Sequence, residues 1–131
     1  MPWDVEYDSE LNFVVCTFVG RVSAAEYIEA KTKAFHLAQE KGTNRYLVDD
    51  TDWETAISVT DMYEWPKLYE QWQADRLSRV AVIMPNPDSP EARDLDFYET
   101  ASRNRGWNVS VFPTRDEAVA WLLEPDDAGD S

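Results

Sequence analysis

The chain has 131 residues, of which 12 are Lys or Arg and 26 are Asp or Glu, so its formal net charge is −14 with the single His counted as neutral. Hydrophobic residues make up 44% of the sequence and aromatic residues 13%, which is too apolar for a disordered chain and enough for one domain with a packed core. The negative charge argues against a protein that binds nucleic acid or an anionic membrane.

The N-terminal residues lack the basic start and the apolar stretch of a signal peptide. No apolar run approaches the roughly 18 residues that cross a bilayer. The only cysteine, Cys16, lies within the apolar stretch 13–19, and a single cysteine forms neither an internal disulfide nor, by itself, a zinc site. We therefore expect a cytoplasmic protein in which Cys16 is a small buried hydrophobe.

The N-terminal third predicts a hairpin followed by a helix. Alternating apolar residues predict a strand over 3–8, and a β-branched and aromatic run predicts another over 11–20 after a short polar turn. A capping box at Ser23 and Glu26 predicts a helix that ends at Gly42. The apolar stripe of this helix is expected to consist of Ala24, Tyr27, Ile28, Ala34, Phe35 and Ala38.

The rest of the chain alternates between strands and helices. A strand is expected over 45–50 and a polar loop over 51–57. The next helix is capped by Ser58 or Thr60, and Pro66 is expected to kink it or to begin a new helix. The remaining strand, helix, strand and helix are expected over 79–84, 89–105, 108–113 and 114–122.

The resulting order, ββαβαβαβα, predicts the fold class. It indicates an α/β domain with a mixed sheet of about five strands, mostly parallel after the hairpin, covered by about four helices. A single domain should span 1–123. The acidic segment 124–131 cannot bury apolar surface, so we expect it to be disordered.

With this order of elements, several segments resemble the SpoIIAA-like proteins, relatives of the STAS (sulfate transporter and anti-sigma-factor antagonist) domain. The resemblance is carried by the strand Arg79–Ile83 and by the runs 104–112 and 117–122, and it extends over 5–123. It implies the SpoIIAA-like fold and no general enzymatic activity. The same fold is also similar to the lipid-binding lobe of CRAL-TRIO domains.

The resemblance also suggests where this chain could be modified. In anti-sigma-factor antagonists, a serine within an Asp-Ser-Ser-Gly run at the start of the helix after the third strand is phosphorylated. This chain lacks that run, since residues 49–51 read Asp-Asp-Thr and the helix begins near 58–61. Ser58 and Thr60 are the positional counterparts and hence the candidate phosphorylation sites. Their alternative role is to cap the helix.

Acidic residues gather after the third strand, at Asp49, Asp50, Asp52 and Glu54. Ligand sites of open α/β sheets lie at the carboxyl ends of strands, and carboxylate oxygens suit hard cations. Asp49, Asp50 and Asp52 are therefore weak metal candidates for a metal-dependent enzyme, although an acid-rich chain also forms such groups by chance. Otherwise we expect no catalytic residue, no cofactor and no enzyme, because no nucleophile–base pair or glycine-rich phosphate loop is present.

Aromatic residues are concentrated between the third and fourth strands, at Trp53, Tyr63, Trp65, Tyr69 and Trp72. Helical spacing places the last three on one face, as in a core, whereas Trp53 and Tyr63 should be partly exposed. Such a cluster suits a protein interface, including a homodimer, or an apolar pocket lined by Trp65, Tyr69 and Trp72. The leading hypothesis is a non-enzymatic protein-binding or regulatory module. The alternative is a carrier of a small apolar or lipid-like ligand.

Overall fold

A computed structural model describes residues 3–55 and 58–125 of the chain. Within them the elements follow the predicted order, which confirms the α/β class. They are β1 (Trp3–Asp8), β2 (Phe13–Val22), α1 (Ala24–Lys41), β3 (Arg45–Thr55), α2 (Val59–Gln71), β4 (Arg79–Ile83), α3 (Pro90–Asn104), β5 (Asn108–Phe112) and α4 (Arg115–Leu122).

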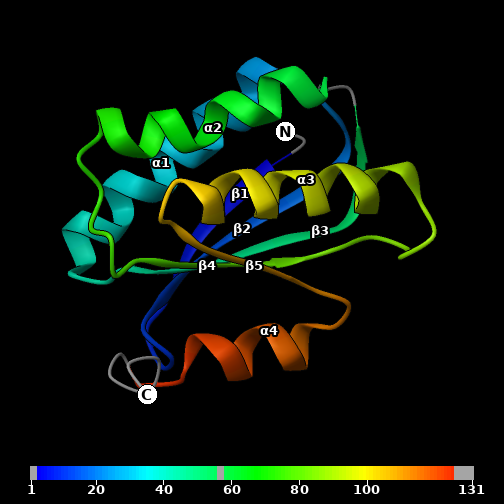
Figure 1. The fold of residues 1–131 in the computed structure, drawn as a ribbon. Coiled ribbons are helices and arrows are strands. Elements are labelled where there is room, and N and C mark those ends of the chain that lie inside the picture. Colours follow the sequence, from blue (N-terminus) through cyan, green and yellow to red (C-terminus); the bar gives the residue numbers. More distant parts are fainter. Residues whose placement is uncertain (1–2, 56–57, 126–131) are drawn as a thin grey trace.

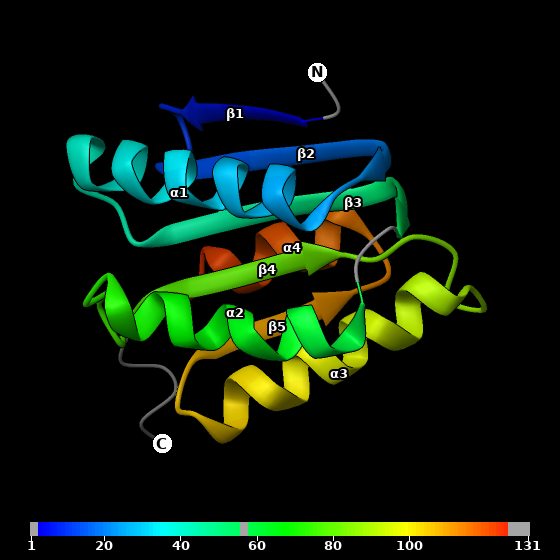
Figure 2. The same ribbon diagram turned by 90° about the horizontal axis from the view of Figure 1, so that it is seen from above.

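The five strands form one sheet in the order β1-β2-β3-β4-β5. β1 and β2 are antiparallel, and every later pair of neighbours is parallel. Figure 1 shows α1, α2 and α3 on one face of this sheet and α4 on the other. Seen from above, α1 lies over β2, α2 lies toward β4 and β5, and α3 runs beside β5 (Figure 2). Parallel neighbours need such crossover helices, since a tight turn cannot join them.

α1 begins and ends where its capping residues predict. The Ser23 hydroxyl accepts a hydrogen bond from the backbone N–H of Glu26 at 3.2 Å, and the Glu26 carboxylate accepts one from the N–H of Ser23 at 3.0 Å. At the other end Gly42 adopts φ 70°, in the left-handed region, and its N–H donates to the carbonyls of Ala38 and Gln39. These bonds satisfy groups that a helix end otherwise leaves unpaired.

β3 is longer than its sequence predicts. It was expected to end at Asp50 and instead runs to Thr55. Asp50 and Thr51 together face the single residue Phe18 of β2, which marks a β-bulge. Beyond the bulge β3 pairs with the last four residues of β2. The prediction of a loop from Thr51 onward is therefore wrong, because this part of the backbone pairs with a long neighbouring strand. The last two residues of that loop, 56 and 57, lie outside the described residues.

α2 starts at Ser58, whose hydroxyl accepts from the N–H of Asp61 at 3.1 Å. Ser58 is therefore the cap, and Thr60 lies inside the first turn. The helix continues through Pro66 as a single element, so the expected restart at this residue is wrong. Phosphorylation of Ser58 or Thr60 stays a prediction.

The sheet separates two hydrophobic clusters, because successive side chains of a strand point to opposite faces. The larger cluster lies on the side of α1, α2 and α3 and contains most of the buried aromatic rings. The smaller cluster lies under α4 and consists of Phe13, Leu47, Ala81, Ile83, Ala118 and Leu122. Among the described residues, no helix combines the length and apolarity needed to cross a bilayer.

The segment after α4 is held by a buried arginine. The Arg79 side chain is 8% exposed, and its guanidinium donates to the backbone carbonyls of Trp121, Glu124 and Pro125 at 2.8 to 3.0 Å. The first two residues of the acidic tail are thus fixed to the domain. Residues 126–131, the rest of the segment expected to be disordered, lie outside the described residues.

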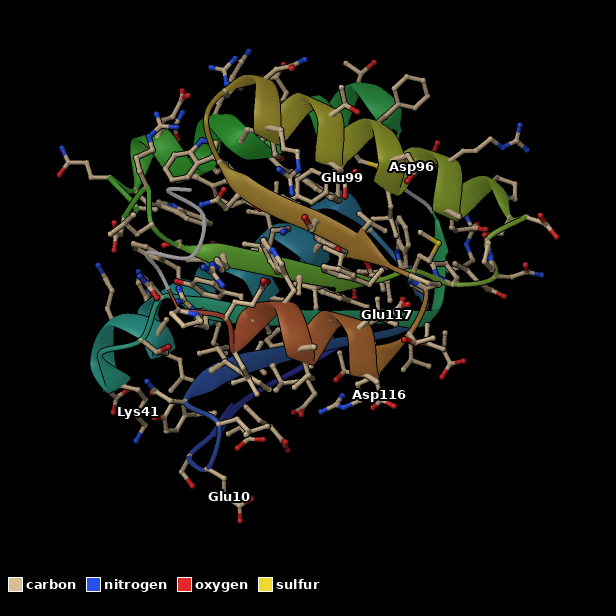
Figure 3. The ribbon with its side chains drawn as sticks, turned by 60° about the horizontal axis from the view of Figure 1, so that its bottom comes forward. Glu10, Lys41, Asp96, Glu99, Asp116 and Glu117 are labelled. Carbon is tan, nitrogen blue, oxygen red and sulfur yellow. The ribbon has the colours of Figure 1, made fainter. Side chains whose placement is uncertain are left out.

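Both edges of the sheet are protected against pairing with another strand. On β5, the backbone N–H of Val111 donates to the carboxylate of Glu99 at 2.6 Å, and Figure 3 shows Glu99 on α3 next to this strand. On β1, Asp4 and Glu6 are exposed. Covering an edge or placing charge on it discourages edge-to-edge association.

The capping box of α1 supplies a test of local stability. We expect Ser23→Ala to lower the free energy of unfolding by about 1 kcal/mol, because the N–H of Glu26 loses its acceptor. The measurement is urea denaturation followed by circular dichroism. Ser9→Ala, in the exposed turn between β1 and β2, serves as the control and should leave stability unchanged. Equal losses in the two variants would contradict the assignment.

Candidate functional site

A stack of aromatic rings lies between the sheet and the helices. The ring of Tyr27, from α1, is parallel to that of Phe18, from β2, with centroids 4.0 Å apart, and to that of Trp65, from α2, with centroids 4.4 Å apart. The edge of this stack meets Tyr98 of α3, whose ring centroid lies 5.2 Å from that of Trp65. All four side chains are buried. The stack therefore connects one strand with all three helices of this face.

A lysine is buried against this stack. The side chain of Lys31, on α1, is 7% exposed. Its Nζ donates to the hydroxyl of Tyr69 at 2.9 Å and to that of Tyr98 at 3.4 Å, and the two hydroxyls are hydrogen-bonded to each other. The ring centroids of Tyr27, Trp65, Tyr69 and Tyr98 all lie 5.1 to 5.5 Å from Nζ. Hydrogen bonds to neutral hydroxyls and cation–π contacts thus stabilise the ammonium group.

A carboxyl group is buried nearby. Asp50 is fully buried at the bulge of β3, and its Oδ2 accepts from the hydroxyl of Tyr27 at 3.0 Å. Its Oδ1 has no hydrogen-bond partner. Burial raises the pKa of Asp50 to about 7, against the opposing effects of the Tyr27 hydrogen bond and the Lys31 charge. None of the ion pairs found among the described residues joins Asp50 to Lys31, so the two groups act on each other at longer range.

Burial keeps the other titratable groups of this layer neutral. It raises the pKa of Tyr27, Tyr69 and Tyr98 well above the ordinary value of a phenol, so these hydroxyls remain donors. It also raises the pKa of the Cys16 thiol to about 12. Cys16 is buried as predicted, and a thiol with such a pKa is a poor nucleophile because the thiolate is the reactive form.

A pocket opens beside Lys31, between α1, α2 and the sheet. Its cavity volume is about 50 Å³. Its lining is largely apolar and aromatic, and includes Phe35, Tyr46, Tyr69, Trp72, Val80 and Trp107. Lys31 is the only lysine or arginine in the lining formed by the described residues. An apolar lining with a few polar groups is typical of a small-molecule site.

The mouth of the pocket is polar, and it lies at the amino ends of the parallel strands. The pocket shares Phe35, Tyr46, Ala74 and Ser78 with a shallow groove whose other lining residues include Gln39, Asn44 and Gln73. The sequence placed the metal candidates at the opposite edge, at the carboxyl end of β3. The pocket combines side chains of the helices with side chains of the sheet that come from distant parts of the chain.

One pair of rings spans the gap between the two helices. Phe35 of α1 and Trp72, the C-cap residue that follows α2, are stacked with their centroids 5.1 Å apart and an interplanar angle of 23°. Both are only half-buried and both line the pocket. These two side chains therefore form part of the pocket wall.

The predicted aromatic residues lie mostly inside the molecule. Trp53 was expected to be partly exposed, and this is wrong, because its exposed fraction is 2%. The continuation of β3 beyond the bulge turns Trp53 inward, with its ring centroid 5.9 Å from that of Tyr27. Tyr69 and Trp72 line the pocket as predicted, whereas Trp65 lies deeper and outside the lining. The side chain of Tyr63 lies outside the described part of the structure.

The acidic residues after β3 do not converge. Asp50 is buried against Tyr27, Asp52 is exposed, and a carboxylate oxygen of Asp49 accepts from the N–H of Thr51. In the chain as described, no group of three or more His, Cys, Asp or Glu side chains is arranged to hold a metal ion. The predicted metal site at Asp49, Asp50 and Asp52 is therefore wrong. Side-chain alternation and the bulge direct these carboxylates apart.

Sequence reasoning missed Lys31. Tyr27, Lys31, Ala34 and Ala38 follow one another at intervals of four, three and four residues, which is the spacing of one helix face. The predicted apolar stripe included the other three and passed over the charged residue. A lysine at the centre of an apolar stripe was the available signal for a buried cation.

Comparison with known proteins identifies the fold. No family model matches this chain, and no curated protein matches it. Among solved structures, it is similar to an uncharacterized protein of the DUF3478 family with a SpoIIAA-like fold from Shewanella loihica PV-4. The TM-score is 0.52 and the sequence identity 18%, over 92% of this chain and 91% of the other. The chain therefore has the SpoIIAA-like fold that its sequence predicts.

The buried carboxyl group predicts a specific pH dependence. Because the pKa of Asp50 is about 7 in the folded protein and about 3.9 in an unfolded chain, the stability that neutral Asp50 contributes is complete below about pH 4 and is lost as the pH rises to about 7. Asp50→Asn removes this titration and keeps an oxygen for Tyr27. Relative to the unmodified protein, we expect its free energy of unfolding to rise by on the order of 4 kcal/mol over that interval.

Urea titrations at a series of pH values measure this difference. Asp52→Asn is the matched control, since Asp52 is exposed on the same strand, and its difference from the unmodified protein should not follow the same pH course. A difference between Asp50→Asn and the unmodified protein that stays constant from pH 4 to pH 7 would contradict the assigned titration.

Proposed function

We propose that this chain is a non-enzymatic binding protein for a small, largely apolar ligand, held in the pocket between α1 and α2. The observation that carries the proposal is a largely aromatic and apolar cavity whose lining includes the buried Lys31. Burial of an apolar ligand against rings such as Trp72 and Trp107 supplies the main binding free energy. The polar mouth allows one end of a longer molecule to remain in water.

The character of the pocket favours binding over catalysis. Cys16, the only nucleophilic thiol of the chain, has its pKa raised to about 12 by burial. The only histidine, His36, is exposed and is absent from the pocket lining. Covalent or acid–base catalysis uses groups with pKa values near the working pH, close to the reacting atoms. Asp50, with a pKa of about 7, is not among the described lining residues. The described lining offers apolar contact, the Lys31 ammonium group and neutral polar side chains such as Ser78.

Binding of a protein partner is the second candidate function. In this proposal, the ligand changes the surface that the partner contacts. The aromatic residues that suggested an interface, including Trp53 and Trp65, face inward. Phe35 and Trp72 are the exception, since both are half-buried at the surface. A ligand that enters the pocket would displace these stacked rings and change the surface between α1 and α2. A partner, or a second copy of the chain, that contacts this surface would then respond to the ligand.

Filling the pocket tests the proposal. Ala34 lines the pocket and is 2% exposed, so Ala34→Leu places three extra carbons inside it. We expect the neutral dye N-phenyl-1-naphthylamine to bind the unmodified protein with a rise in dye fluorescence. Ala34→Leu should weaken this binding about tenfold, because the added side chain occupies the ligand's space.

Ala25→Leu is the matched control, since Ala25 is exposed on the same helix. It should bind the dye like the unmodified protein, and thermal denaturation should show that both variants are folded. Equal affinities of Ala34→Leu and Ala25→Leu would place the dye elsewhere and contradict the proposal. Mass spectrometry of an organic extract of the purified protein complements the titration, and a bound apolar compound is the expected finding.

A further inference from the structure

We infer that the ligand of this pocket carries a single carboxylate, which is bound by Lys31 of the pocket lining. The inference rests on the proposed function and specifies its ligand class. It starts from the position of Lys31, which is both 7% exposed and part of the pocket lining. Polar groups buried this deeply normally have hydrogen-bond partners.

The hydrogen bonds of Lys31 leave one donor for a ligand. An ammonium group has three N–H donors, and within the described chain two of them are directed to the hydroxyls of Tyr69 and Tyr98. Tyr69 also lines the pocket. When Tyr98 donates in the hydrogen bond between the two hydroxyls, the hydroxyl hydrogen of Tyr69 is available as well. One N–H and one O–H then match the two oxygens of a carboxylate.

The charge balance points to the same ligand class. The described neighbours of the ammonium are two neutral hydroxyls and four aromatic rings. Asp50 is the nearby acid, but its Oδ2 is occupied by Tyr27 and it forms no ion pair with Lys31. Burial also favours the uncharged form of Asp50. A ligand carboxylate would supply the direct negative partner, and a charged pair hydrogen-bonded out of water is strong.

The rest of the pocket distinguishes a carboxylate from other anions. Around Lys31 the lining consists of side chains such as Ala34, Val48 and Val80. A phosphate brings three acceptor oxygens and close to two charges, more than two donors can satisfy in these surroundings. Unsatisfied charged oxygens in an apolar lining are costly to bury. A monocarboxylic acid with a short hydrocarbon chain matches both the Lys31 ammonium group and the apolar lining.

Four eight-carbon compounds with different head groups test this inference. They are octanoate, 1-octanol, octylammonium and octyl phosphate, each titrated into the full chain by calorimetry at pH 6, below the pKa of Asp50. We expect octanoate to bind about tenfold more tightly than 1-octanol, which has the same chain without the charge. Octylammonium should bind most weakly because it places a cation against Lys31.

A pair of lysine variants assigns the preference to one residue. Lys31→Met keeps the length and apolar stem of the side chain and removes its charge, and it should lower octanoate affinity about tenfold while 1-octanol affinity is retained. Lys33→Met is the control, because Lys33 is exposed on the same helix. It should leave both affinities unchanged. Circular dichroism establishes that each variant is folded.

The outcomes separate the two proposals. Equal affinity of the unmodified protein for octanoate and 1-octanol would overturn the carboxylate inference and leave the apolar pocket standing, and this comparison needs no variant to fold. A preference for octyl phosphate would overturn it as well. Octanoate binding that survives Lys31→Met would place the carboxylate elsewhere. Failure of all four compounds to bind would overturn the proposed function together with the inference.

Discussion

The burial of one ammonium group is the constraint on which the helix layer depends. Removing a lysine charge from water costs several kcal/mol per ion, and Lys31 regains this stabilisation only where hydroxyls and ring faces surround it. Tyr69 comes from α2 and Tyr98 from α3, so two helices must take definite positions relative to α1 before the charge is satisfied. A displacement of either helix would remove one of the two hydroxyl partners of Nζ, which makes the arrangement of the three helices cooperative.

Strand β3 extends this constraint into the sheet. Ordinary alternation along β3 directs Asp50 toward α1, where Tyr27 donates to it across 23 positions of sequence. Tyr27 in turn lies between the rings of Phe18 and Trp65. The bulge opposite Phe18 then shifts the alternation by one position, so that Trp53 also faces the helices. Alternation thus supplies the acid, and the aromatic stack holds the tyrosine that binds it.

Local signals explain what the sequence could predict. The caps at Ser23, Ser58 and Thr114, together with Gly42, act over three or four residues, so they can be recognised without knowledge of the fold. The continuation of β3 could not be recognised in this way. Its residues are polar and acidic, and they form a strand because β2 offers an unusually long neighbour. Trp53 is buried for the same nonlocal reason, which is why its surroundings gave no indication of it.

The site was harder to predict than the fold because its parts come from distant positions. Lys31 and its two hydroxyl partners are 38 and 67 residues apart, and no local pattern relates them. Tyr69 and Trp72 could be predicted as pocket residues, since helical spacing places them on one face. The pocket position at the amino ends of the strands could not, because its lining combines side chains from distant parts of the chain.

Two residues belong both to the pocket lining and to the hydrogen-bonded group that joins the helices. Lys31 and Tyr69 line the cavity and also hold α1 to α2. An anionic ligand that hydrogen-bonds to either group changes the partners on which the helix positions depend, and one that enters past Phe35 and Trp72 also separates the outer contact between the same helices. Under the proposed function, ligand binding and helix arrangement would therefore be coupled through a single small set of side chains. Occupancy of the pocket would then change the outer surface of the domain without any chemical step.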